Sequence, residues 1–126
     1  MLNAAYAHNA YTQTKVKTTY NPVELVIMLY DGAIEFLDKA ITATTKKEIE
    51  TKIKYIDKTM AIIEELHNAL DLEKGGDVAR NLQDLYVYMM RELVLANADN
   101  DAEKMEHIAG LLKPLREGWV SIRNTV

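Results

Sequence analysis

Glutamate and histidine side chains on several predicted helices could together bind metal ions. Glu64 and His67 form a Glu-x-x-His motif, which supplies ligands to the two iron ions of di-iron helical bundles. Such a site also needs ligands from the neighbouring helices. The candidates in this chain are Glu35, Glu92, Glu103 and His107. A di-iron enzyme is therefore one hypothesis for the function.

The spacing of these residues argues against that hypothesis. Glu103 and His107 are four residues apart, whereas a second Glu-x-x-His motif requires three. If the first helix folds back on the second near Thr44, Glu35 lies level with residue 54 and about 15–20 Å from His67 along the helix axis. Because His67 also falls on an apolar stripe, it is better explained as a histidine in or at the edge of the core. We therefore predict a protein without enzymatic activity, cofactor or metal.

The composition narrows the remaining classes of protein. The 126 residues suffice for one domain, and 48% hydrophobic residues indicate a folded core. The net charge of −4, without a long run of either sign, disfavours nucleic acid as a partner. The absence of cysteine excludes disulfides and fits a reducing compartment. The N-terminus lacks the pattern of a signal peptide, and no apolar run approaches the ~20 residues of a membrane span. These features predict a cytoplasmic protein without membrane insertion.

Capping motifs divide most of the chain into four helices. Asn21, Pro22 and Glu24 have the residue types expected where a helix starts. Similar signals recur at three later points, namely Thr45 with Glu48, Asp77 after the glycines Gly75 and Gly76, and Asn100 with Glu103. The expected helices span residues 22–42, 46–72, 77–97 and 101–123. Short turns between helices of similar length predict an all-α, antiparallel up-down four-helix bundle over residues 21–126, with a kink at Pro114.

Residues 1–20 lack a helical stripe and are expected to form an extended or mobile segment. Their tyrosines, among them Tyr6 and Tyr11, supply more apolar area than a solvated tail needs. Two alternatives stay open, a disordered tail and a segment docked on the bundle. In the docked case the segment would cover an apolar surface.

The predicted helices carry more apolar residues than one buried stripe requires. Leu25 to Tyr30 are six consecutive apolar or aromatic residues, which cover every face of a helix. We predict an apolar groove outside the bundle that accepts an amphipathic helix of a partner. A bundle that forms homo-oligomers through this second stripe is the alternative. The second helix also has a heptad seam, which consists of Ile49, Ile53, Ile56, Met60, Ile63, His67 and Leu70.

Three stretches of the chain contain a distinctive order of motifs. They are AYTQTKVKTTYNPVELVIMLYDGAIEFLDKA, LDLEKGGDVARNLQDLYVYMMRELVLAN and NDAEKMEHIAGLLKPLREGW. With MLYDGA, EKGG and the terminal Trp in this order, the chain from about Tyr11 to Trp119 closely resembles the FliS family of flagellar secretion chaperones. It departs from the family pattern at Asn21, where the family usually has Ser, and at Pro114 in the last helix.

The resemblance implies a cytoplasmic export chaperone without enzymatic activity. Such proteins bind the disordered C-terminal segment of flagellin, prevent its premature polymerisation and deliver it to the flagellar type III export apparatus. The resemblance also implies contacts with an anti-sigma factor and with a component of the export gate. It further implies an N-terminal segment that lies over the client surface and moves aside.

Helical spacing divides the apolar residues of the expected bundle between the core and the client surface. We expect Leu25, Met28 and Leu29 to face the core. The client-binding surface is expected to comprise Ile27, Tyr30, Ile34, Tyr55, Ile62, Leu66, Tyr86, Met90 and Asn97. Tyr6 and Tyr11 are expected to form the N-terminal cap over it.

Overall fold

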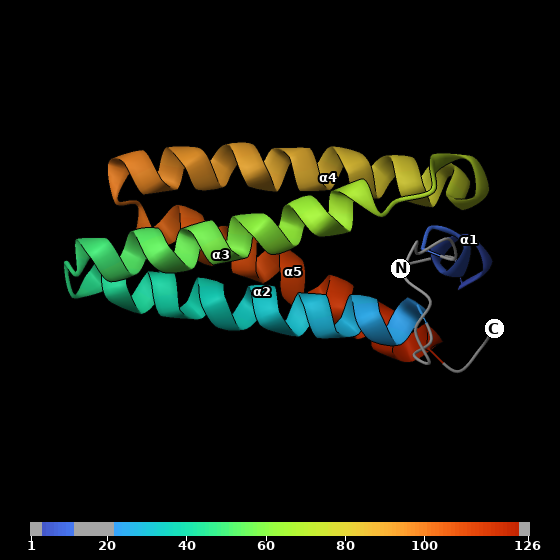
Figure 1. Cartoon of the computed structure of the whole chain (residues 1–126), viewed down its shortest axis with the longest axis horizontal. Helices are drawn as coiled ribbons and strands as arrows, with labels where there is room; N and C mark the ends of the chain where they lie inside the picture. The colour runs from blue at the N-terminus through green and yellow to red at the C-terminus, as the bar shows by residue number, and fades with distance from the viewer. Residues whose placement is uncertain (1–3, 12–21, 124–126) are drawn as a thin grey trace.

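The computed structural model describes residues 4–11 and 22–123, and the regular elements within them are all helices. Four of these helices are long and antiparallel, and Figure 1 shows them packed together. They are α2 (Pro22–Thr45), α3 (Ile49–Asn68), α4 (Leu72–Asp99) and α5 (Ala102–Ile122), preceded by the short α1 (Ala4–Asn9). The predicted all-α, antiparallel up-down four-helix bundle is confirmed.

The short helix α1 closes one end of the bundle. α2 and α4 each pack against both α3 and α5, and α1 packs against α4 and α5. Figure 1 shows α1 at the end where α2 and α4 begin. The expectation of an extended segment is therefore wrong for residues 4–9, where Ala-rich sequence forms a docked helix. Residues 1–3 and 12–21, including the predicted cap Asn21, lie outside the described residues.

The turn between α2 and α3 differs from the predicted capping motif. Thr45 is the last residue of α2, and its hydroxyl donates to the Ile41 carbonyl at 3.1 Å. Lys47 has a φ of 61°, so the chain turns in a left-handed conformation before α3 begins. Glu48 precedes α3 without a side-chain cap. Thr45 therefore completes α2 and does not start α3, because its hydroxyl bonds back to its own helix.

The other two helix starts also differ from the prediction, by five residues for α4 and by one residue for α5. α4 begins after Asp71, whose side chain accepts a hydrogen bond from the Lys74 amide at 3.0 Å. Gly76 adopts the expected positive φ of 53°, but it interrupts α4 internally, so Asp77 is not the cap. Asn100, with a φ of 51°, ends α4, and Asp101 caps α5 by accepting from the Lys104 amide. α5 continues through Pro114 to Ile122.

The six consecutive apolar residues of α2 divide between the core and the surface differently from the prediction. Met28 is 57% exposed, whereas Ile27 and Tyr30 are buried. Leu25 and Leu29 are half-buried. Assigning Met28 to the core and Ile27 and Tyr30 to an outer face was therefore wrong. A continuous apolar run contains no polar residue that would mark which face meets solvent.

The predicted α3 seam is correct at Ile56 and Ile63, which are buried. At Ile53, Met60 and His67 the preceding residue is buried instead. Ile49 and Ile53 are exposed, and Lys52 and Thr59 are buried instead. The Lys52 ammonium donates to the Asn97 carbonyl at 2.9 Å and also to Asn100 Oδ1. The Thr59 hydroxyl donates to its own helix at the Tyr55 carbonyl. Both buried polar groups thus have partners, which makes their burial possible.

Candidate functional site

Three tyrosines from distant parts of the chain meet under α1 and form the tyrosine cluster, Tyr11, Tyr30 and Tyr86. The hydroxyl oxygen of Tyr86 lies 2.8 Å from that of Tyr11 and 2.6 Å from that of Tyr30. The Tyr11 hydroxyl donates to the Leu66 carbonyl at 2.9 Å. All three side chains are at most 1% exposed.

Only one arrangement of the hydroxyl protons forms all three hydrogen bonds of this cluster. Each tyrosine hydroxyl has a single proton to donate and lone pairs to accept with. Because Tyr11 donates to the Leu66 carbonyl, its oxygen accepts from Tyr86 and Tyr86 in turn accepts from Tyr30. The chain of bonds therefore runs from α2 through α4 to Tyr11, two residues after the end of α1, and ends on the α3 backbone. It links α1 to three helices of the bundle.

Burial makes the tyrosine cluster a neutral group over a wide pH range. Burial raises the pKa of Tyr30 to about 12, and its hydrogen bond to Tyr86 opposes that shift. Burial is also the main cause that raises the pKa of Tyr11 and the pKa of Tyr86. The three hydroxyls therefore stay protonated near neutral pH, where they act as hydrogen-bonding groups and not as acids or bases.

Trp119 packs beside the cluster from α5. Its ring lies 5.4 Å from that of Tyr11 in an edge-to-face arrangement and 6.5 Å from that of Tyr30. The side chain is fully buried, and it is the single tryptophan of the chain. Its fluorescence will therefore report on whether Tyr11 occupies its position.

Small residues allow α1 to approach α4 closely. A Cβ atom added to Gly75 would lie 2.9 Å from the Ala10 Cα, so a larger residue would push α1 away. The Asp71 amide donates to the Ala10 carbonyl at 2.8 Å. The Tyr6 ring covers Gly76 and is 49% exposed. α1 is thus held on the bundle by close backbone contacts with α4 and by the contacts that Tyr11 makes.

The predicted client-binding residues do not form one exposed surface. Four of them are buried, namely Ile27, Tyr30, Leu66 and Tyr86. Replacing Ile27 or Leu66 with aspartate would therefore destabilise the fold, and a loss of client binding would not identify a contact. The other five are half-buried and are distributed over α2, α3 and α4; they are Ile34, Tyr55, Ile62, Met90 and Asn97. Their role in binding stays a prediction. Of the predicted cap, Tyr11 does cover Leu66 and Tyr86.

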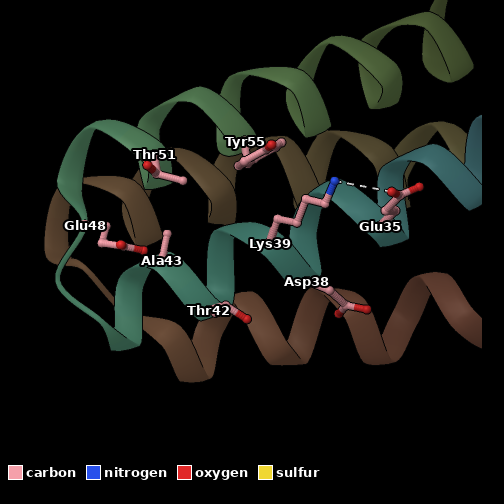
Figure 2. Close-up of a pocket in the computed structure, with 8 residues that line it drawn as sticks. All are labelled: Glu35, Asp38, Lys39, Thr42, Ala43, Glu48, Thr51 and Tyr55. Atoms are coloured by element: carbon pink, nitrogen blue, oxygen red, sulfur yellow. Dashed lines mark ion pairs between the residues drawn. The ribbon is translucent and has the colours of Figure 1, made fainter.

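An open depression of about 490 Å³ lies at the opposite end of the bundle, by the α2–α3 turn. Figure 2 shows its polar walls and the ion pair of Lys39 with Glu35 at 3.3 Å. Tyr55 on its wall stacks on Phe36 with 5.8 Å between ring centroids. The lining residues are Glu35, Asp38, Lys39, Thr42, Ala43, Glu48, Thr51 and Tyr55. Both side chains of the ion pair are largely exposed, so they are solvated surface charges.

The candidate di-iron ligands lie apart from one another. Glu92 pairs with Lys104 at 3.4 Å, and His107 lies 3.3 Å from the Tyr88 hydroxyl. Within residues 4–11 and 22–123, no three His, Asp or Glu side chains are grouped so that they could hold a metal ion. No helix in the same part of the chain is long and apolar enough to cross a membrane.

The described residues form a helical bundle in which α1 covers the tyrosine cluster and no acidic or histidine side chains are grouped to hold a metal ion. The chain matches the family model of the flagellar protein FliS over residues 2–126. The flagellar secretion chaperone FliS of Campylobacter jejuni is 36% identical over 118 residues, which cover 94% of this chain and 91% of that protein. The FliS chaperone of Salmonella typhimurium is 38% identical over 117 residues, with 90% and 87% of the two chains covered. The FliSB chaperone of Pseudomonas aeruginosa is 36% identical over 122 residues, with 94% and 97% covered.

The chain belongs to the FliS family of flagellar secretion chaperones. The resemblance found in the sequence motifs is thereby confirmed. Proteins of this family are chaperones and not enzymes, so the di-iron hypothesis is discarded.

Proposed function

We propose that this protein binds the disordered C-terminal segment of flagellin in the cytoplasm and keeps it from polymerising prematurely. The complex then delivers the client to the flagellar type III export apparatus. Family membership supports this proposal, since the relatives carry the name flagellar secretion chaperone. The apolar residues Ile34, Ile62 and Met90, which are only half-buried, fit a polypeptide client whose apolar side chains supply most of the contacts.

The covered tyrosine cluster is the observation that carries the proposal. α1 has six residues, and an isolated helix of this length is marginal in water. Its docking rests on the buried side chains of Ala7, Ala10 and Tyr11. An element with so few buried contacts opens at low free energy. A client segment can therefore replace α1 at the end of the bundle while α2 to α5 stay folded.

Removal of α1 would free two hydrogen-bonding positions that a client can fill. The Leu66 carbonyl and the Tyr86 hydroxyl both lose Tyr11 as a partner. Water reaches both groups once α1 leaves, so each hydrogen bond that a client supplies contributes a net of about 0.5–1.5 kcal/mol. Trp119 offers an aromatic surface beside these groups. The half-buried side chains of Ile34, Ile62 and Met90 would extend the contacts along the bundle.

The client must fold as it binds, which determines the thermodynamic signature of the complex. A disordered segment loses conformational entropy, and only a large apolar interface offsets that loss. Titration calorimetry with a peptide of the last ~50 residues of the organism's flagellin tests this. We expect a 1:1 complex, a strongly negative heat-capacity change and added helicity by circular dichroism. A scrambled peptide is the control, and no binding by the folded protein would contradict the proposed function.

A further inference from the structure

Three residues that disfavour helices recur on one face of α5. Gly110, Pro114 and Gly118 follow one another at intervals of four residues, which places them on the same side of the helix. Proline is the least favourable residue in a helix interior, and glycine is the next. α5 nevertheless continues through all three to Ile122. Because the sequence of this part of α5 disfavours a helix, tertiary contacts must stabilise it.

Pro114 removes one hydrogen bond from the middle of α5. Since proline has no amide proton, the Gly110 carbonyl has no donor four residues later, and the proline ring crowds that carbonyl. Gly110 is exposed, and a Cβ atom added to it would meet no atom of a neighbouring helix within 4 Å among the described residues. Packing against another helix therefore does not account for this glycine. The hydrogen bonding of α5 is thus weakest between Gly110 and Pro114.

Few contacts hold the part of α5 that follows Pro114, residues 115–122, which we call the α5 tail. Its buried side chains are those of Trp119 and Ile122. Its last turn is loosely bonded, because the Arg123 amide lies 3.5 Å from the Val120 carbonyl. The part of α5 before Pro114 is anchored by more buried side chains, namely Met105, Ile108, Ala109 and Leu112.

Two ion pairs at the surface attach the tail to α2. Arg116 pairs with Asp31, and the Arg123 guanidinium, directly after α5, lies 3.8 Å from the Glu24 carboxylate. The four side chains are each at least 33% exposed, so solvent weakens both pairs. These pairs orient the tail on α2 and add little to its stability. The attachment of the tail therefore rests mainly on its buried side chains.

We propose that the α5 tail unfolds locally as one unit whose boundary is Pro114. Unwinding α5 from its C-terminus breaks hydrogen bonds, but it relieves the crowding at the Gly110 carbonyl once Pro114 leaves the helix. Further unwinding brings no such relief and exposes Leu112, which is buried. The opening therefore stops at Pro114. A local opening of this kind has a lower free energy than unfolding of the whole bundle.

Opening of the tail would uncover the tyrosine cluster from the side of α5. Trp119 is the tail residue whose ring packs on the rings of Tyr11 and Tyr30. When the tail unfolds, Trp119 leaves them, while α1 keeps its backbone contacts with Asp71 and Gly75. The cluster thus has two separate covers, α1 and the α5 tail. This inference is independent of the proposed function, because it concerns the protein without its client.

Hydrogen exchange along α5 tests the position of the boundary. Unfolding of the tail breaks the helical bonds of the amides of residues 115–118, whereas the amides of residues 111–113 keep theirs. In the protein without client, we expect the first group to exchange about tenfold or more faster than the second, after correction for intrinsic rates. A gradual decline in protection towards the C-terminus, without a step at Pro114, would be ordinary fraying of a helix end and would overturn the proposal.

Two variants test whether Pro114 causes the step. Pro114→Ala supplies the missing donor at an exposed position, so the difference between the two groups of amides should shrink to about twofold or less. The ratio of the two exchange rates is compared, because it cancels changes in global stability. Lys113→Ala, at the adjacent exposed position, is the matched control and should leave the ratio within about twofold of its original value. A step of unchanged size in Pro114→Ala would overturn the role of Pro114.

Exchange in α1 tests whether the two covers open separately. If they do, residues 4–11 exchange at the same rate, within about twofold, in Pro114→Ala and in the original protein. Slower exchange of residues 4–11 in parallel with the tail would show that α1 and the tail open together, and it would overturn the tail as a unit of its own.

Discussion

The hydroxyl oxygens of Tyr11 and Tyr86 lie 2.8 Å apart, although 75 residues separate them in the chain. This contact joins Tyr11, two residues after the end of α1, to the middle of α4, and it completes the bonds from Tyr30 to the Leu66 carbonyl. The position of α1 and the hydrogen bonding of the bundle interior are therefore linked. In the proposed function, the same contact holds the client site closed.

Removal of one hydroxyl should loosen α1 without unfolding the bundle. Tyr11→Phe keeps the ring against Trp119 but leaves the Leu66 carbonyl without its donor. The lost bonds cost roughly 1–3 kcal/mol of α1 docking. Hydrogen exchange should become faster in residues 4–11 and change little in α2 to α5. Tyr88→Phe, at a 37% exposed tyrosine, is the control, and equal exchange in both variants would contradict the assigned role.

Alkaline pH should destabilise the protein through the buried tyrosines. The pKa of Tyr30 is about 12 in the folded protein against an ordinary value of 10, so the unfolded chain releases its proton first. The raised pKa of Tyr30 contributes to the free energy of unfolding fully below pH 10, and this contribution is lost as the pH rises through about 12. The total loss is roughly 3 kcal/mol. Urea unfolding between pH 8 and 11.5 measures this decline. Tyr30→Phe should decline less steeply, and parallel curves would disprove the assignment.

Trp119 should be a major contributor to stability. Its side chain is fully buried and contacts the rings of Tyr11 and Tyr30. Trp119→Ala therefore removes a large apolar side chain and leaves a cavity. We expect a loss of about 3–5 kcal/mol in the free energy of unfolding. Denaturant unfolding followed by circular dichroism measures it. A loss below about 1 kcal/mol would show that the site collapses or that the ring is dispensable.

The buried lysine should hold the end of α4. Lys52→Met keeps the length of the side chain but removes the bonds to the Asn97 carbonyl and Asn100 Oδ1. Because hydrogen bonds of charged groups are worth about 1.5–3 kcal/mol, we expect a loss of that order, reduced by the lower cost of burying a neutral side chain. Lys54→Met, at an exposed position, is the matched control. Equal stabilities of the two variants would contradict the role of Lys52.

The sequence predicts the helices better than the faces they bury. Apolar periodicity and Pro22 locate the bundle, because these signals act within one helix. The α3 seam was correct at Ile56 and Ile63 but missed Lys52 and Thr59, because these two look like surface residues. Their burial depends on Asn97, Asn100 and a backbone carbonyl, and the first two belong to another helix.

The candidate site depends still more on distant contacts. The tyrosines are visible in the sequence, but no spacing rule pairs Tyr11 with Tyr86. Ile27 and Tyr30 could not be assigned to a face, because apolar neighbours surround them on all sides of the helix.

The most direct test of the central claim is the client affinity of a protein in which α1 cannot dock. Ala10 is buried against Gly75, so Ala10→Leu displaces α1 and leaves residues 22–123 unchanged, while Ala5→Leu at an exposed position of α1 is the control. Trp119 fluorescence verifies the opening, and calorimetry with the flagellin peptide gives the affinities. If α1 and the client compete, Ala10→Leu binds the peptide roughly fivefold or more tightly, because the cost of opening is removed. Unchanged or weaker binding by Ala10→Leu would contradict the claim that α1 covers the client site.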